Sequence, residues 1–588
     1  MILSTLSRSL IGRSGVCSNI FKTNVIVNKS NVWFKQMHLS ASVCTLKKPE
    51  HIYTSPHTDV QIPDMTLIDF LKDKSKDYDD RIATVCAETG EEMRYGELWA
   101  KVGSVASALV KLGIGLGSTV GLVSPNCPEF VICFLATAAT GATITTVNSL
   151  YTPAEISRQL EDSGASAVIY HPTTAAVVLG ATQMLPPGSV KHMISTHEAV
   201  NSGDLALLTL EADDGLAYPK NLQVDLASDV LVLPYSSGTT GVPKGVELTN
   251  RCIVCNLQQV SHPKVVFHNP DGVSVLFSVV PMFHIYGMVA CLMLSILTGS
   301  KSVTFHKFDP QLFIKSMVQY KPTVMHLVPP ILNFLVQSPK VLPEYMASMR
   351  TIVCGAASVG DVIVKQVHDK FGSGILFQEG FGMTELSPGA HLTIMGECTP
   401  GSCGPPLSNT MTKLVHVETK ETLGPDDGPG EICIKGPQLM KGYRNNPEAT
   451  AATIDADGWL YTGDIGRVDS DGNLFIIDRL KELIKVKGFQ VAPAELENLL
   501  KDCPGVADSA VIGVKHDKLG EAPLAYIVKN PKHESITEEH IQKYIADRLS
   551  THKHLAGGVV FLDAIPKGST GKILRKELKQ MAESDSSN

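Results

Sequence analysis

A run of hydroxyl-bearing and glycine residues, Tyr235-Ser-Ser-Gly-Thr-Thr-Gly-Val-Pro-Lys244-Gly, directly follows an apolar stretch that ends at Pro234. Glycine lets the backbone fold closely around an anion, and a lysine adds positive charge. Gly245 stands where the Walker pattern needs Ser or Thr for a metal ion, so this is a different kind of polyphosphate loop. A plain linker is the alternative, but linkers do not usually follow a buried strand. The candidate phosphate-binding residues are Ser236, Ser237, Gly238, Thr239, Thr240 and Lys244.

Five further segments hold residues suited to nucleotide and acyl chemistry. Each is weak alone, because Thr-Gly-Asp is a common turn and a single histidine is usually structural. Ile573 follows Lys572, which again excludes a Walker motif. In chain order the segments are Pro281-Met-Phe-His284-Ile-Tyr-Gly287, Glu379-Gly-Phe-Gly-Met-Thr-Glu385, Tyr461-Thr-Gly-Asp464, Asp478-Arg479-Leu-Lys481-Glu-Leu-Ile-Lys485-Val-Lys-Gly488-Phe-Gln490 and Pro566-Lys-Gly-Ser-Thr-Gly-Lys572-Ile.

Together and in this order, the segments resemble those of the adenylate-forming enzymes: acyl-CoA synthetases, firefly luciferase and peptide-synthetase adenylation domains. The sequence is most similar to the 4-coumarate–CoA ligase-like branch, over roughly residues 60–580. The resemblance implies an ATP-dependent acid–thiol ligase that uses Mg²⁺, with coenzyme A as co-substrate. Such an enzyme adenylates a carboxylic acid, releases pyrophosphate and passes the acyl group to coenzyme A. The expected partners are therefore small molecules: the acid, ATP and coenzyme A.

The resemblance also implies nucleotide-binding roles. Phe381 would lie along the adenine, Thr384 would donate to the α-phosphate, and Glu385 would hold Mg²⁺. Because the acid and the phosphate are both anionic, a metal is needed to reduce their repulsion. Glu379 departs from the glutamine usual in the ligase branch. Asp464 and Arg479 would contact the ribose. The other nucleotide contacts that the resemblance implies are Gly380, Gln490 and Lys572.

Two lysines would serve two poses of the enzyme. In the family pattern Lys572 supports adenylation, and the C-terminal domain then turns about Lys481. This turn would bring Lys485 and Gln490 to the adenylate for thioester formation. His284 would gate the acyl pocket, which the resemblance lines with His284, Ile285, Tyr286, Gly355, Ala356 and Ala357. The catalytic residues expected are thus Lys572, Lys485, His284 and Thr384.

Strand and helix patterns alternate through the first 400 residues. Apolar runs predict strands over 119–123, 167–170, 230–234, 273–279, 324–327 and 351–354, with helices over 66–78, 95–112 and 129–139. From about residue 404, short strands separated by Gly, Pro and Asp predict a small β-rich subdomain. We therefore expect an α/β protein with two α/β subdomains, a small β-barrel-like subdomain and a mobile α+β C-terminal lid. The expected domains are 46–478 and 479–588.

Charge is distributed unevenly along the chain. Residues 1–49 contain seven Lys or Arg and no acid, which is typical of a mitochondrial transit peptide. We therefore expect residues 1–45 to direct the protein to the mitochondrial matrix. The alternative is that these residues form a tail without a targeting signal and that the protein is cytoplasmic. The net charge of −8 argues against a nucleic-acid partner. No apolar run reaches the length of a membrane span.

The 13 cysteines fit reduced thiols. Cys252 and Cys255, with Cys398 and Cys403, could supply four sulfurs for zinc, but the apolar residues between the first pair favour packed thiols. A mitochondrial address favours a medium- or long-chain fatty acid as substrate; a 4-coumarate-type aryl acid is the alternative. A peptide-synthetase module is a weaker rival because the chain carries no carrier domain, and an inactive scaffold is weaker because the expected lysines are present. A luciferase-type oxygenase shares every motif, and only an oxygen-dependent product would distinguish it.

Overall fold

The computed structural model describes residues 51–236, 243–266, 272–355, 361–397, 399–487, 489–531, 535–568 and 571–585. They belong to one compact unit, Glu50–Asn588. The expected N-terminal address lies outside the described residues. So do six of the candidate site residues: Ser237, Gly238, Thr239, Thr240, Ala356 and Ala357.

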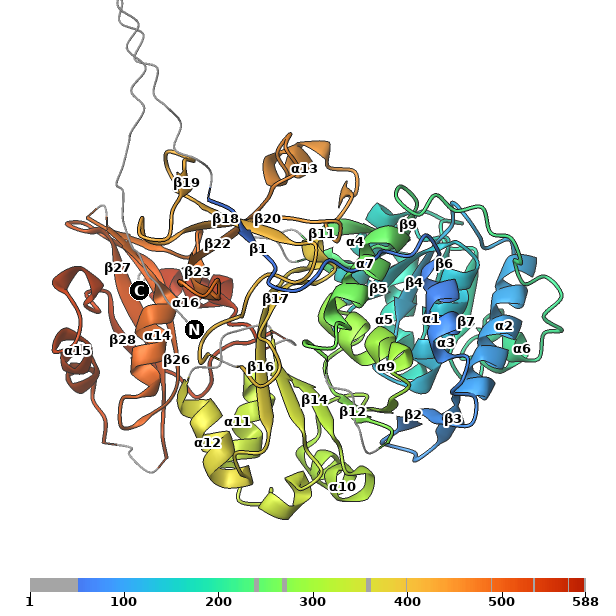
Figure 1. The fold of residues 1–588 in the computed structure, drawn as a ribbon, viewed down its shortest axis with the longest axis horizontal. Coiled ribbons are helices and arrows are strands. Elements are labelled where there is room, and N and C mark those ends of the chain that lie inside the picture. The colour runs from blue at the N-terminus through green and yellow to red at the C-terminus, as the bar shows by residue number, and fades with distance from the viewer. Residues whose placement is uncertain are drawn as a thin grey trace, which may run out of the picture. The chain divides into compact units, whose positions relative to one another are not determined.

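The first sheet is built around parallel strands. β4 (Thr119–Val123) lies between β5 (Thr143–Val147) and β6 (Ala167–Tyr170), and the strand order is β10-β11-β9-β5-β4-β6-β7-β8. Helix α3 (Pro128–Ala139) packs on β4 and β5, and helices α1 (Leu67–Ser75) and α2 (Tyr95–Lys111) pack on α3 (Figure 1). α3 is almost entirely buried, which agrees with its largely apolar sequence. The remaining strands are β7 (His192–Ser195), β8 (Leu205–Ala206), β9 (Val230–Val232), β10 (Tyr235–Ser236) and β11 (Lys244–Thr249).

The second sheet has the order β17-β16-β15-β14-β12-β13-β2-β3 and is parallel from β16 to β2. Its core packs Phe277, Phe305 and Phe313 with ring centroids 5.2–5.5 Å apart. The strands are β2 (Ile82–Cys86), β3 (Glu92–Arg94), β12 (Val275–Ser278), β13 (Lys301–Thr304), β14 (Val324–Leu327), β15 (Thr351–Cys354), β16 (Leu376–Gly382) and β17 (Gly389–Leu392).

The third sheet is antiparallel and follows the path β1-β18-β20-β22-β23. Its strands are β1 (Tyr53–Thr54), β18 (Met411–Val415), β20 (Gly430–Lys435), β22 (Leu460–Val468) and β23 (Leu474–Arg479), with β19 (Thr422–Leu423) paired to β18. β22 and β23 run side by side, so they place residues 464 and 479 opposite each other.

The C-terminal residues form a small α+β layer of their own. β24 (Ile484–Val486), β25 (Phe489–Val491), β26 (Val506–His516), β27 (Gly520–Lys529) and β28 (Gly558–Phe561) make one sheet. Helices α14 (Pro493–Lys501), α15 (Glu538–Ala546) and α16 (Arg575–Asp585) belong to the same segment. The large α/β part and the small C-terminal part confirm the expected fold class.

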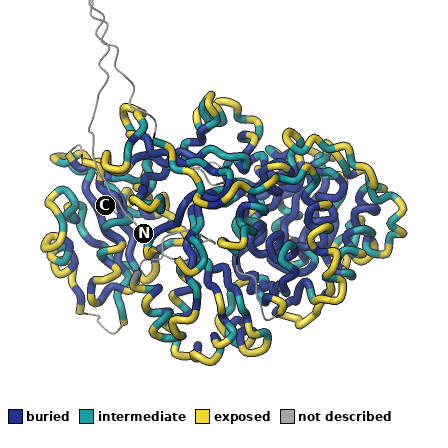
Figure 2. The backbone as a smooth tube through the Cα atoms, in the orientation of Figure 1, coloured by how far each residue is buried: buried dark blue, intermediate teal, exposed yellow. Residues whose placement is uncertain are grey.

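The six strands and three helices predicted by residue range in the sequence analysis lie within a few residues of observed elements. The predicted strands 119–123, 167–170, 324–327 and 351–354 match β4, β6, β14 and β15. The apolar stretch 288–297 is helical and almost entirely buried. Buried residues follow the strands of the sheets, whereas exposed residues mark the connecting turns (Figure 2). None of the described helices is long and apolar enough to cross a membrane.

Candidate active site

A cavity of about 780 Å³ opens where strands and loops of the three N-terminal sheets meet the loop before α16. Five of the six motifs contribute predicted residues to its lining, and Asp464 of the remaining motif does not line it. The predicted residues that line the cavity are Ser236, Lys244, His284, Ile285, Tyr286, Gly355, Gly380, Phe381, Thr384, Glu385, Arg479, Lys481 and Lys572. The topology thus gathers residues as far apart in the chain as Ser236 and Lys572 into one site.

Glu385 is the centre of a polar cluster at one end of the cavity. Its Oε1 accepts hydrogen bonds from the Ser236 hydroxyl at 3.1 Å and from the Tyr443 hydroxyl at 2.8 Å. The Lys244 ammonium lies 4.8 Å from the centre of the Tyr443 ring. Ser236 and Lys244 face each other across the β10–β11 hairpin, so the two ends of the predicted phosphate loop are held beside Glu385.

The chemistry of this cluster fits a magnesium ion. Glu385 is 4% exposed and belongs to a short helical turn that begins at Thr384, next to the cavity. Both hydrogen bonds fall on Oε1, which leaves Oε2 as a hard oxygen ligand of the kind Mg²⁺ prefers. Thr384 adds a hydroxyl, and Lys244 can balance phosphate charge.

Asp464 and Arg479 form the pair expected at the ribose. Arg479 Nε lies 3.2 Å from Asp464 Oδ1, because residues 464 and 479 are register partners in β22 and β23. Burial raises the pKa of Asp464, while Arg479 and Lys572 lower it. Arg479 lines the cavity and Asp464 lies directly behind it, beside the lining residue Gly463.

Lys572 reaches the same region from the C-terminal segment. It lines the cavity and belongs to the exposed residues. Desolvation by the enclosing protein lowers the pKa of the Lys572 ammonium, and Arg479 lowers it further. The negative charges of Asp464, Glu482 and Glu385 raise the pKa of Lys572 and partly offset this lowering. The structure therefore places Lys572 within electrostatic range of both the ribose pair and the Glu385 cluster.

His284 stands between the polar end and an apolar arm of the cavity. Its Nδ1 accepts from the Tyr286 backbone N–H at 3.3 Å, so the neutral ring carries its proton on Nε2. Desolvation and the charge of Lys572 lower the pKa of His284 to about 4. The backbone of residue 287 lies so close to Pro281 that only glycine fits there, because a Cβ would lie 2.2 Å from the Pro281 carbonyl oxygen. Gly287 thus permits the tight turn that carries His284.

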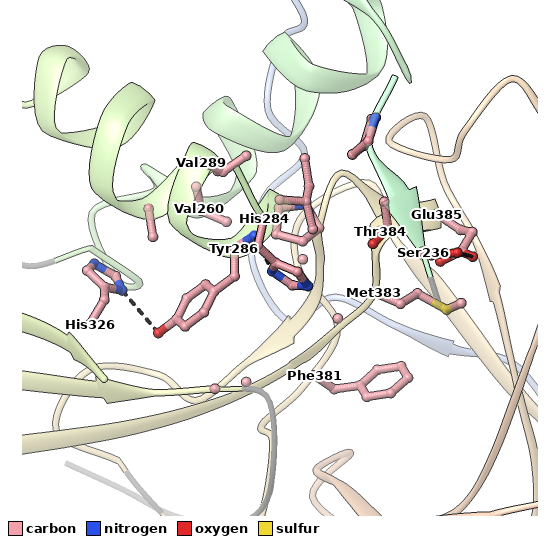
Figure 3. Close-up of a pocket in the computed structure, with 18 of the residues that line it drawn as sticks. Ser236, Val260, His284, Tyr286, Val289, His326, Phe381, Met383, Thr384 and Glu385 are labelled. Atoms are coloured by element: carbon pink, nitrogen blue, oxygen red, sulfur yellow. Dashed lines mark hydrogen bonds between the residues drawn. The ribbon is translucent and has the colours of Figure 1, made fainter. Parts of the chain in front are cut away.

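The apolar arm extends past His284. Tyr286 closes one wall: its hydroxyl lies 3.2 Å from the Val353 carbonyl oxygen, to which it donates, and 3.4 Å from His326 Nδ1. Figure 3 shows the Tyr286–His326 contact at one end of the view and Ser236 with Glu385 at the other. The arm is lined by Val260, Leu276, Val289, Ala290, Leu294 and Val324.

Several predicted site residues lie elsewhere. Glu379 does not line the cavity, although its neighbours Gln378 and Gly380 do, because successive residues of strand β16 face opposite sides. Lys485 and Gln490 are exposed partners in the β24–β25 hairpin and do not line the cavity either. Lys485 is held there by a 2.7 Å bond from its backbone N–H to Glu521. This arrangement corresponds to the pose expected for adenylation.

Sequence reasoning missed Tyr443 and His326. Tyr443 lies on the two-residue strand β21 (Gly442–Tyr443), which pairs with β11, and His326 is buried within β14. Neither belongs to a recognisable motif. Of the two, His326 was easier to predict from the sequence, since a histidine inside an otherwise apolar strand needs a polar partner.

Comparisons with known proteins agree with this site. Residues 71–444 match the AMP-binding enzyme family, and residues 495–572 match the AMP-binding enzyme C-terminal domain. Rice 4-coumarate–CoA ligase 5 (Oryza sativa subsp. japonica) is 40% identical over 542 residues, covering 90% of this chain and 97% of the rice protein.

Two solved structures are also similar. ATP-bound MatB from Rhodopseudomonas palustris superposes with a TM-score of 0.78 at 28% identity, covering 88% of this chain and 99% of that one. A Mycobacterium tuberculosis fatty acyl CoA synthetase superposes with a TM-score of 0.67 at 29% identity, covering 88% of this chain and 99% of that one.

The chain has a large α/β part and a small C-terminal part, and its cavity brings together the Ser236–Lys244 strand pair and the Glu385 cluster in front of the Asp464–Arg479 ion pair. With the relatives above, this fold and site define an adenylate-forming ligase. The chain belongs to the AMP-binding enzyme family. It is an acid–thiol ligase that uses ATP, Mg²⁺ and coenzyme A. The luciferase, carrier-module and scaffold alternatives do not match these relatives.

Proposed function

We propose that the acid activated by this enzyme is a monocarboxylate with an apolar body, of the 4-coumarate type. The observation that carries this proposal is the apolar arm beyond His284, which ends in the Tyr286 ring and its contact with His326. The names of relatives such as the rice enzyme support an aryl acid rather than the fatty acid expected from the sequence.

The chain's own residues divide the work of the first half-reaction. Lys244 and the hairpin around it bind phosphate, Glu385 supplies the carboxylate that would hold magnesium, and Lys572 faces the same space. A bound magnesium ion would screen the repulsion between acid and phosphate. Groups fixed in this way stabilise developing charge without reorganising, which is usually the largest contribution to catalysis.

His284 separates this polar end from the arm. With a pKa of about 4 the ring is neutral at physiological pH, so it can border an apolar acyl group without introducing a charge. Its Nε2–H remains a hydrogen-bond donor. His284 therefore suits a gate that accepts an apolar acyl body and leaves the carboxylate at the polar end.

A medium- or long-chain fatty acid is the second candidate. The arm is also lined by Leu276, Leu294 and Val324, apolar side chains that suit a flexible aliphatic tail. The similar fold of the Mycobacterium tuberculosis fatty acyl CoA synthetase supports the same possibility. A mitochondrial location, which residues 1–45 would provide, would also favour it.

A direct test is coenzyme A-dependent AMP release with a matched panel of acids. We expect kcat/KM for hydroxycinnamates to exceed that for saturated acids of six to sixteen carbons by at least tenfold. A reversed order would establish the fatty acid and reject the aryl proposal. Dicarboxylic acids serve as a negative control, since a second carboxylate would have to enter the apolar arm unpaired.

A further inference from the structure

A cluster of metal-ligating side chains lies away from the cavity. Cys86 Sγ is 3.6 Å from Glu88 Oε2 and 4.0 Å from His306 Nε2, and the ligand atoms of all three residues lie within 4.8 Å of one another. None of the three lines the active-site cavity described above. A soft thiolate, an imidazole and a carboxylate are together the ligand set typical of zinc.

The topology explains why these residues meet. Cys86 ends β2, and its register partner Thr304 ends the parallel strand β13, two residues before His306. The carboxyl ends of neighbouring parallel strands share one edge of a sheet, which is where α/β proteins place their ligands. Glu88 is fixed by the His306 backbone N–H, which donates to Oε1 at 2.8 Å, so Oε2 remains available.

The separations are close to those a bound ion requires. Zinc bonds of about 2.3 Å to sulfur and about 2.0 Å to nitrogen in a tetrahedron place the two ligand atoms roughly 3.5 Å apart. The observed distance of 4.0 Å between Cys86 Sγ and His306 Nε2 therefore needs a closure of about half an ångström. That shift is small for one side chain at the end of a strand and one in the loop after β13.

A second observation comes from the first sheet. His171 directly follows β6, and its ring lies 5.1 Å from the His306 ring and 4.9 Å from the His197 ring, centroid to centroid. His171 is 5% exposed, and its Nε2 is a buried polar atom without a hydrogen-bond partner among the described residues. Such atoms are rare because leaving one unpaired is costly. A water on a neighbouring metal ion would supply a partner.

We propose that Cys86, Glu88 and His306 bind one zinc ion, with His171 beside its fourth, solvent-derived ligand. The site would link the β2 and β13 ends of the second sheet to the β6 end of the first. Binding replaces the Cys86 S–H bond by a sulfur–metal bond and releases the thiol proton to solvent. Burial raises the pKa of the Cys86 thiol, so the metal-free protein holds that proton at neutral pH.

Cobalt(II) titration of the full-length, chelator-treated protein tests the proposal. We expect one equivalent to produce a thiolate-to-cobalt absorption band and one equivalent of zinc to abolish it. Cys86→Ser should remove the band. Cys503→Ser is the matched control, because Cys503 is similarly buried but lies in the C-terminal core, and it should leave the band unchanged.

Glu88→Gln keeps the test decisive if the cysteine variant does not fold. The Glu88 side chain is exposed, so its replacement should not disturb the core, yet zinc affinity should fall by roughly tenfold or more. Zinc should also raise the melting temperature of the wild type and not of Cys86→Ser. A band that survives Cys86→Ser, disappears equally in Cys503→Ser, or is missing from the wild type would overturn the proposal.

Discussion

The Tyr443 hydroxyl donates a 2.8 Å hydrogen bond to Oε1 of Glu385, the carboxylate that faces the phosphate hairpin. This bond holds Oε1 and leaves Oε2 as the predicted ligand for magnesium. Partners that orient a metal ligand typically contribute 10- to 100-fold in metal affinity. Tyr443 is thus a positioning residue for the predicted magnesium ligand.

Replacing Tyr443 should weaken magnesium binding while keeping the ring that faces Lys244. For Tyr443→Phe we expect the Mg²⁺ concentration at half-maximal pyrophosphate exchange to rise by roughly 10- to 100-fold. Tyr218→Phe is the control, since its hydroxyl contacts Lys72 far from the cavity. An unchanged magnesium requirement would show that Ser236 alone orients Glu385.

The two lysines should fail in different half-reactions. Lys572 lines the cavity, whereas Lys485 is exposed on β24. Lys572→Ala should lose roughly 10²–10³ in acid-dependent pyrophosphate exchange yet still convert supplied acyl-adenylate to acyl-CoA. Lys485→Ala should do the reverse, and Lys515→Ala, an exposed lysine on β26, should change neither. Equal loss of both steps in the two variants would mean that one fixed site performs both.

Tyr286 should control the length of acid accepted. Tyr286→Ala removes the wall of the arm, so the ratio of kcat/KM for a long acid to that for a short one should rise by roughly tenfold. Tyr286→Phe keeps the ring and loses the bonds to Val353 and His326, and we expect its preference to match the wild type. Competition assays with paired acids measure the ratio. The same shift in both variants would assign selectivity to the hydroxyl instead.

Buried histidines should make the fold sensitive to acid. Burial lowers the pKa of both His326 and His391 to about 4, against an unfolded value of about 6.5. The unfolded chain therefore binds protons first, so stability is complete above pH 6.5 and falls as the pH drops from 6.5 to 4. Each histidine should contribute a slope of about 1.4 kcal/mol per pH unit in that window.

Denaturant unfolding across pH 4.5–7.5 measures this slope. His391→Gln should flatten it by one histidine's contribution, because the amide can replace the bonds to Gly404 and Thr412 without titrating. His540→Gln, at an exposed position on α15, should leave the slope unchanged. A wild-type slope in His391→Gln would mean that His391 does not titrate in this range.

The N-terminal prediction concerns residues that the structure does not describe. The absence of acids before Glu50 predicts an address that is removed on import. Mass spectrometry of the mature protein from mitochondria should find an N-terminus near residue 45. A cytosolic protein that retains Met1 would contradict this prediction.

The sequence was most informative where one local pattern determines structure. The apolar run 119–123 is bounded by Ser118 and Ser124 and became β4 residue for residue. Motif order likewise brought Ser236, Glu385 and Lys572 to one cavity. Tyr443 could not be found in this way, because its contact with Glu385 depends on the pairing of β21 with β11. Glu379 shows the converse: its motif is right, but the alternation of β16 turns the side chain away.

The cross-strand partners Asp464 and Arg479 also have a kinetic consequence. Arg479 is the last residue of β23, and Lys481, the predicted hinge, follows two residues later. A nucleotide held by this pair is thus anchored next to the axis about which the C-terminal domain would turn. If this pair holds the nucleotide as predicted, pyrophosphate would leave before that rotation, whereas AMP would stay attached at the pivot until the thioester had formed. We therefore expect an ordered release in which AMP departs last, so accumulated AMP should compete with ATP and not with coenzyme A.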